Sequence, residues 1–184
     1  EVLQEVVDQN DILRCEAEAL LAGIVLDTKS FTLRTGGRTF EAAAFLRRCG
    51  ADTVEVKRLF QNNLSDTIAK FDIISNARTY KNGIVIAAIN HTVGRVTAAQ
   101  AADELLSIQG VRASFVIFRV GNEIAISARS LGDVNVQILL EEFGGGGHLN
   151  MAGAQIKNST TNDVRKALIR VLDEKLSEAT KKNN

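Results

Sequence analysis

The run Gly144-Gly145-Gly146-Gly147, followed directly by His148, is the stretch of this sequence whose residue types point most clearly to chemistry. Four consecutive glycines lose much backbone entropy on folding, so their presence in a folded chain needs a reason. Glycine lets backbone amides approach an anion closely, and a histidine can donate a hydrogen bond to a phosphate oxygen. The pattern predicts an anion-binding loop, although it matches neither a Walker loop nor a dinucleotide-binding fingerprint.

A second candidate site consists of Arg129 and Ser130, which end an expected strand just before a helix. Ligands often bind at such strand ends in open sheets. The guanidinium offers a two-pronged fork for phosphate, and the serine offers a hydroxyl. An arginine at a strand end is usually a solvated charge when it stands alone, but its combination with the glycine run favours a phosphate site.

Asp27 ends a short apolar run, 22–26, which is a common position for a metal ligand and equally for a helix cap or turn residue. One aspartate does not make a metal site, because a two-metal phosphoryl-transfer centre needs several carboxylates or histidines. Of the two histidines, we expect His91 to lie in a surface loop. Arg34 and Arg38 could face an anionic ligand.

The composition is that of an ordinary globular protein and excludes a disordered chain, with 45% hydrophobic and 24% charged residues among 184. Because 22 basic residues balance 22 acidic ones, bulk charge does not attract nucleic acid or an anionic membrane, and phosphate recognition has to be local. No apolar run reaches the roughly 20 residues of a membrane span. We expect no membrane contact, a cytoplasmic location, and two free, buried or half-buried thiols, Cys15 and Cys49.

The elements that must position these residues form a helix-rich first part and a mixed second part. The first part is expected to contain helices over 2–21 (interrupted at Asn10-Asp11), 39–48, 52–61 and 66–78, while 22–26 is open between a helix end and a strand. The second part is expected to contain strands 84–89, 111–120, 123–128 and 154–157, the last at a sheet edge, and helices 97–108, 134–143 and 162–180. This β-α-β-β-α-β-α order predicts an α/β (α+β) fold, with a mixed sheet, helices on one face and a boundary near 80–82.

Together these residues resemble the DHH/DHH-associated-domain phosphoesterase superfamily, and most closely its branch of cyclic-di-AMP phosphodiesterases, the GdpP type. Segments 129–136 and 143–148 carry the resemblance to the DHH-associated domain through their order and spacing. Segments 23–31 and 34–43 resemble the late part of the DHH domain. The resemblance implies a truncated DHH domain over 1–80 and a DHH-associated, substrate-binding domain over 81–184.

The resemblance further implies the C-terminal part of a manganese-dependent phosphodiesterase that hydrolyses cyclic di-AMP to pApA. Asp27 then matches the last metal-binding aspartate of the family, whereas Arg129, Ser130, the glycine run and His148 match the residues that hold substrate phosphate. Met151 departs from the usual Ala-Ala-Gly pattern. The Asp-His-His triplet that names the family is missing from this sequence, so we expect an incomplete Mn²⁺ site and no catalysis by this chain alone.

Alternative functions remain open at this point. An oligonucleotide or pAp phosphatase (nanoRNase-like) of the same superfamily would share the glycine run and Asp27. An alternative from a different functional class is a non-catalytic nucleic-acid-binding module, like those attached to alanyl-tRNA synthetases. The expected partner is a cyclic dinucleotide or short nucleotide phosphodiester. A homodimer and a parent protein anchored in a membrane upstream of this part are both compatible with the sequence.

Overall fold

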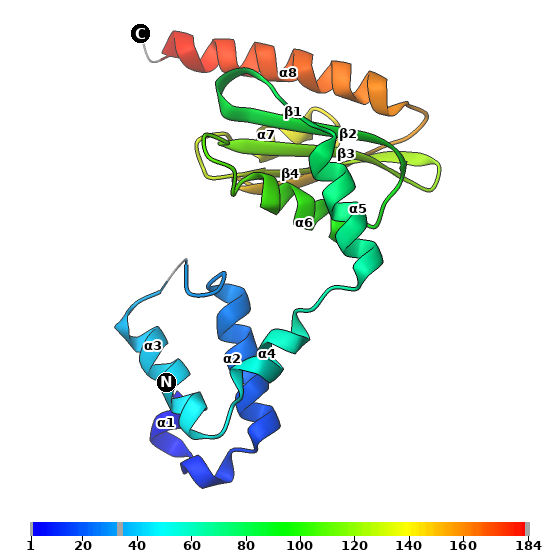
Figure 1. The fold of residues 1–184 in the computed structure, drawn as a ribbon. Coiled ribbons are helices and arrows are strands. Elements are labelled where there is room, and N and C mark those ends of the chain that lie inside the picture. Colours follow the sequence, from blue (N-terminus) through cyan, green and yellow to red (C-terminus); the bar gives the residue numbers. More distant parts are fainter. Residues whose placement is uncertain (1, 33–34, 183–184) are drawn as a thin grey trace. The chain divides into compact units, whose positions relative to one another are not determined.

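A computed structural model describes residues 2–32 and 35–182 of the chain, so the expectation for Arg34 lies outside the described residues. The chain divides into two compact units, Glu1–Asn62 and Asn63–Asn184 (Figure 1). Within the described residues, no helix combines the length and the apolar character that crossing a bilayer requires.

The first unit is helical throughout its described elements, which are α1 (Val2–Val6), a 3-10 turn (Gln9–Asp11), α2 (Arg14–Asp27), α3 (Gly37–Arg48) and α4 (Thr53–Leu59). The expected interruption at Asn10-Asp11 is confirmed, and 22–26 continues helix α2. Helices α2, α3 and α4 share a small core with the residues Ala17, Leu21, Phe45, Leu46, Cys49, Ala51 and Val56. Both cysteines are free, but the expected burial holds only for Cys49, because Cys15 lies on the solvent side of α2.

The second unit is built on a six-stranded mixed sheet. Its strands are β1 (Ala77–Thr79), β2 (Ile84–Thr92), β3 (Ala113–Val120), β4 (Glu123–Ser130), β5 (Gly146–His148) and β6 (Met151–Ile156), in the order β1-β2-β3-β4-β6-β5. Only β2 and β3 pair in parallel, because helix α6 (Arg95–Leu105) provides the crossover that a parallel pair needs. The expected hairpin is confirmed, since Val120 pairs with Glu123 across a two-residue turn.

Helices cover both faces of the sheet, so the expectation of helices on one face is wrong. Helices α5 (Leu64–Ser75) and α6 pack on one face, and α7 (Val136–Glu141) and α8 (Thr161–Lys182) pack on the other (Figure 1). The physical reason lies in β2 and β3, whose successive residues are apolar and therefore need cover on both sides. Ile84 and Phe115 face α8, whereas Val85 and Val116 face α6.

The predicted α/β (α+β) class is confirmed, with three local corrections. The helix expected over 66–78 ends at Ser75, and Ala77–Thr79 forms strand β1 instead. Half of the glycine run is not a loop, because Gly146–His148 forms strand β5. The strand expected at the edge, 154–157, lies in β6, and β5 pairs outside it.

The division between the two compact units falls before α5 because this helix packs on the sheet of the second unit. Ile73 of α5 is fully buried in the same core as Val85 and Ala101. The expected boundary between family domains near 80–82 concerns a different division and stays a prediction.

Candidate functional site

The glycine run is explained in large part by the chain's own packing. Gly144 ends α7 in the left-handed conformation (φ 68), where its N–H bonds the carbonyl of Glu141 and the N–H of Gly145 bonds that of Leu140. These two bonds form a Schellman motif, which favours glycine. A Cβ on Gly145 would lie 2.3 Å from the carbonyl oxygen of Gly153, so strand β6 leaves no room for a side chain there.

Gly146 differs from its neighbours, because no contact among the described residues requires a glycine at this position. A Cβ built on Gly146 meets no atom within 4 Å, and its φ is not in the left-handed range. Gly147, by contrast, has φ 153, and its Cβ would lie 2.3 Å from the carbonyl oxygen of Met151. Gly146 therefore borders free space, where its backbone is accessible to a ligand.

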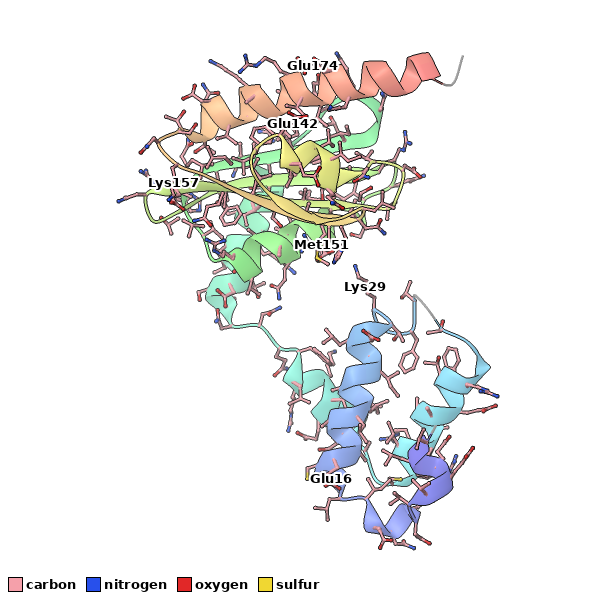
Figure 2. All side chains as sticks on the ribbon, turned by 180° about the vertical axis from the view of Figure 1, so that it is seen from behind. Glu16, Lys29, Glu142, Met151, Lys157 and Glu174 are labelled. Carbon is pink, nitrogen blue, oxygen red and sulfur yellow. The ribbon has the colours of Figure 1, made fainter. Side chains whose placement is uncertain are left out.

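The strand register places two predicted site residues in one row across the sheet. Arg129 of β4 pairs with Met151 of β6, and Met151 pairs with His148 of β5. Directly paired residues share a face, so all three side chains lie on the α6 side, and Figure 2 shows Met151 there. Since neighbouring strands lie about 4.8 Å apart, the backbones of Arg129 and His148 are roughly 10 Å apart.

We call the surface that β4, β6 and β5 present on the α6 side the open face. Its members are Arg129, Ser127, Ala125, Met151, Gly153, Gln155, His148 and Gly146. The residues of β6 and β5 on this face are exposed, whereas Ala152 and Ala154 on the other face of β6 are buried. Small side chains dominate its centre, so a ligand can approach the sheet closely.

The guanidinium of Arg129 is held against the sheet by contacts within the chain. Its Nε lies 3.3 Å from the carboxylate of Asp103 in α6, and its Nη1 donates to the carbonyl of Ala128 at 2.9 Å. Nη1 also lies 3.4 Å from the hydroxyl oxygen of Ser127. The side chain is only 12% exposed. These contacts engage Nε and Nη1 of a group with five N–H donors and fix its orientation.

Ser130 lies on the opposite side of the strand from Arg129, because successive residues of a strand point to opposite faces. It is 5% exposed, and its hydroxyl oxygen accepts hydrogen bonds from the N–H groups of Gly132 (3.0 Å) and Val134 (3.3 Å). In this structure Ser130 shapes the loop that leads to α7. The serine on the open face is Ser127, which strand alternation from Arg129 could have identified.

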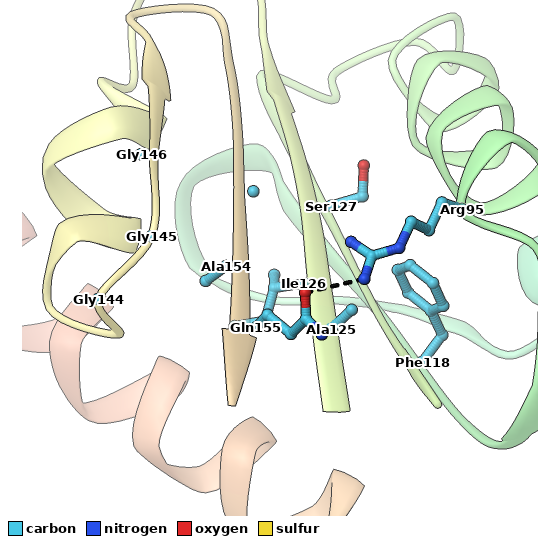
Figure 3. A pocket seen from close by; sticks show the side chains of 11 residues that line it. Arg95, Phe118, Ala125, Ile126, Ser127, Gly144, Gly145, Gly146, Ala154 and Gln155 are labelled. Atoms are coloured by element: carbon cyan, nitrogen blue, oxygen red, sulfur yellow. Dashed lines mark hydrogen bonds between the residues drawn. The ribbon is translucent and has the colours of Figure 1, made fainter. Parts of the chain in front are cut away.

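A groove of about 480 Å³ lies along the open face beside the glycine run (Figure 3). It is lined by Arg95, Phe118, Ala125, Ile126, Ser127, Gly144, Gly145, Gly146, Gly153, Ala154 and Gln155. Arg95 is the first residue of α6, and its Nη2 donates to Oε1 of Gln155 at 2.8 Å across the groove. Neither residue is identifiable from the sequence, because a contact between positions sixty residues apart leaves no local signal.

Asp27 is the last residue of α2 and is exposed. A carboxylate at this end of a helix meets the negative end of the helix dipole, so a nearby cation would be favourable. Three residues with positive φ follow it: Lys29 (44), Ser30 (57) and Phe31 (63). Consecutive left-handed residues are strained, and such strain concentrates at functional sites.

The described residues do not form a metal centre by themselves. Nowhere in 2–32 and 35–182 do three or more histidine, cysteine, aspartate or glutamate side chains gather in a group that could hold a metal ion. Asp27 thus offers a single carboxylate, which does not fit a complete two-metal site.

Most of the second unit matches a known domain family. A family model described as the DHHA1 domain matches residues 81–178, more than half of the chain. The chain therefore belongs to the DHHA1 domain family, and the resemblance found in segments 129–136 and 143–148 is confirmed.

Curated relatives of high similarity are cyclic-di-AMP phosphodiesterases. The chain is 46% identical over 169 residues to PdeA of Listeria monocytogenes, covering 90% of this chain and 26% of the relative. It is 51% identical over 156 residues to GdpP of Geobacillus thermodenitrificans, covering 83% and 24%. The chain thus spans about a quarter of the length of these relatives.

A solved structure supports the fold. The crystal structure of an exopolyphosphatase-related protein from Bacteroides fragilis superposes with a TM-score of 0.79, covering 96% of this chain and 54% of that one. The sequence identity is 22%, so this likeness concerns the fold alone.

Proposed function

We propose that this chain is the nucleotide-binding part of a manganese-dependent phosphodiesterase that cleaves cyclic di-AMP to pApA, and that the open face holds the substrate phosphates. The observation that carries the proposal is the row Arg129–Met151–His148, which brings a largely buried guanidinium and an exposed imidazole to one face of the sheet beside the groove. The names of the relatives, which are cyclic-di-AMP phosphodiesterases, supply the substrate.

The chemistry of the row suits a phosphodiester. Arg129 presents a guanidinium whose orientation is fixed by Asp103, so little entropy is lost when it donates to a phosphate oxygen. His148 is exposed on β5 and can donate a ring N–H, more strongly when it is protonated. The backbone at Gly146 is open to the same space. These local hydrogen-bond donors can therefore bind phosphate although the chain has no net charge.

For the reaction itself we propose that Asp27 is one ligand of a manganese centre whose other donors are supplied by residues outside this sequence. Its exposure and its place at the negative end of α2 support this role. Such a metal would lower the pKa of a bound water and stabilise charge on the phosphate. The chain alone is then expected to be inactive, and manganese-dependent turnover of cyclic di-AMP by these 184 residues would contradict this part.

Binding by the open face is tested by calorimetric titration of the purified chain with pApA and cyclic di-AMP. His148→Ala should weaken binding roughly tenfold, because a hydrogen bond to a charged group is worth about 1.5–3 kcal/mol. The matched control is His91→Ala, since His91 is also exposed but lies on β2 and pairs with Asp72 at 3.3 Å. Equal affinities for the two variants would overturn the proposed phosphate site.

A further inference from the structure

The groove lies next to the two residues that we assign to phosphate, and neither Arg129 nor His148 lines it. Two further rows of paired residues follow the Arg129 row along the open face: Ser127 with Gly153 and Gly146, and then Ala125 with Gln155. Four residues of a strand separate the Arg129 row from the Gln155 row, which is roughly 14 Å at about 3.4 Å per residue. A phosphate bound at the Arg129 row leaves the groove beside the other two rows to another part of the ligand.

Small residues form the floor of the groove, and the planar, cationic guanidinium of Arg95 forms part of its wall. Ala125 and Gly153 carry no side-chain atoms beyond Cβ, and Gly146 borders the groove from β5. The guanidinium of Arg95 reaches across the groove from the first turn of α6 (Figure 3). A planar guanidinium above a floor of small residues suits stacking with an aromatic heterocycle.

Gln155 supplies a polar edge with a defined orientation. Its Oε1 accepts from Arg95, and its Nε2 donates to the carboxylate of Glu123. A cation on one side and an anion on the other fix which end of the amide is oxygen and which is nitrogen. An amide oxygen has two lone pairs and an amide nitrogen two hydrogens, so one acceptor and one donor remain for a ligand.

We propose that the Arg95–Gln155 end of the groove is a base-binding subsite that selects adenine over guanine. A remaining donor and acceptor on one amide match the N7 and N6 amino group of adenine, which a glutamine can contact at once. The corresponding edge of guanine presents two acceptors, N7 and O6, and would need two donors. The subsite rests on the proposed function, because the phosphate of the same nucleotide would lie in the Arg129 row.

The test is a titration of the ¹⁵N-labelled chain with AMP, GMP and inorganic phosphate, followed by backbone amide shifts. AMP should shift the amides of Ser127, Gly153 and Gln155, and bind about tenfold or more tightly than GMP. Phosphate alone should shift only the neighbourhood of Arg129 and His148. Similar affinities for AMP and GMP would overturn the adenine subsite.

A pair of glutamine variants separates base recognition from a purely structural role of the Arg95 contact. Gln155→Ala should weaken AMP binding by about tenfold and leave phosphate binding unchanged. Gln137→Ala is the control, since Gln137 also bonds a glutamate (Glu141, 2.9 Å) but lies on α7, at the other face. A dispersed spectrum confirms that each variant is folded.

The outcomes distinguish failure of the subsite from failure of the phosphate site. Unchanged AMP affinity in Gln155→Ala, with phosphate still shifting the Arg129 row, overturns only the base subsite. No shift of that row by phosphate, AMP or pApA overturns the proposed phosphate site, and the subsite with it.

Discussion

Gly145 and Gly146 are adjacent in the chain but differ in their surroundings: Gly145 has no room for a side chain, whereas Gly146 does. A Cβ on Gly145 would lie 2.3 Å from the carbonyl oxygen of Gly153 and 2.7 Å from Cβ of Ala154. Ordinary van der Waals contact begins at 3.4 Å, and a backbone oxygen cannot move aside as a flexible side chain can. In Gly145→Ala, β5 must therefore shift away from β6. In Gly146→Ala, the new methyl group meets no atom.

The expected magnitude follows from comparing the two variants. Both gain the same stabilisation from a less flexible unfolded chain, about 0.4–1 kcal/mol. Only Gly145→Ala carries the penalty of overpacking, about 1–3 kcal/mol. The two variants should therefore differ in free energy of unfolding by about 1–3 kcal/mol, with Gly145→Ala the less stable.

Urea unfolding followed by tyrosine fluorescence reports on the second unit, Asn63–Asn184, which contains both glycines. The chain has one tyrosine and no tryptophan, and Tyr80 packs against the core of the second unit. With a slope of about 1–3 kcal/mol/M, the midpoints should differ by roughly 1 M. If Gly145→Ala only separates β5 from β6 and the rest of the unit stays folded, the midpoints stay equal. In that case the amide hydrogens of β6 should exchange faster in Gly145→Ala than in Gly146→Ala. Equal midpoints together with equal exchange rates would refute the reasoning.

Three further predictions concern the second unit. Phe115→Ala should lower its free energy of unfolding by about 3–5 kcal/mol in urea, because Phe115 is fully buried between sheet and helices. Asn135→Ala should cost about 1 kcal/mol in the same assay, because the side chain caps α7 by accepting from two backbone N–H groups. Hydrogen bonds from Lys81 and Tyr80 hold the pKa of Asp173 below its usual value, so the stability they give is present above roughly pH 3.9 and is lost as the pH falls through the lowered pKa. Thermal melts should show Asp173→Asn less stable than the natural chain at pH 6, with the gap closing in acid; a constant gap would contradict this.

Much of the sheet could be predicted from local patterns, and the errors have physical reasons. The hairpin of β3 and β4 follows from a two-residue turn between apolar strands. Strand β5 could not be predicted, because glycine has low strand propensity and only pairing with β6 makes Gly146–His148 extended. The second layer of helices, by contrast, was predictable from the unbroken apolar run of β2, which has both faces buried.

The candidate site was only partly accessible from sequence for similar reasons. Arg129 and His148 stand out by residue type, yet the sequence alone does not show that β6 joins them in one row. Ser130 is adjacent to Arg129 in the chain but lies on the other face, where its hydroxyl holds a loop. The contact of Arg95 with Gln155 depends on the tertiary fold and has no sequence signature.

The most direct measurement of the central claim is a crystal structure of this chain with bound pApA. The account predicts a phosphate group on the open face, within hydrogen-bond distance (about 3 Å) of the Arg129 guanidinium and the His148 ring, with the Gly146 backbone beside it. A phosphate bound elsewhere, such as on the α7–α8 side of the sheet, with the open face empty, would contradict it.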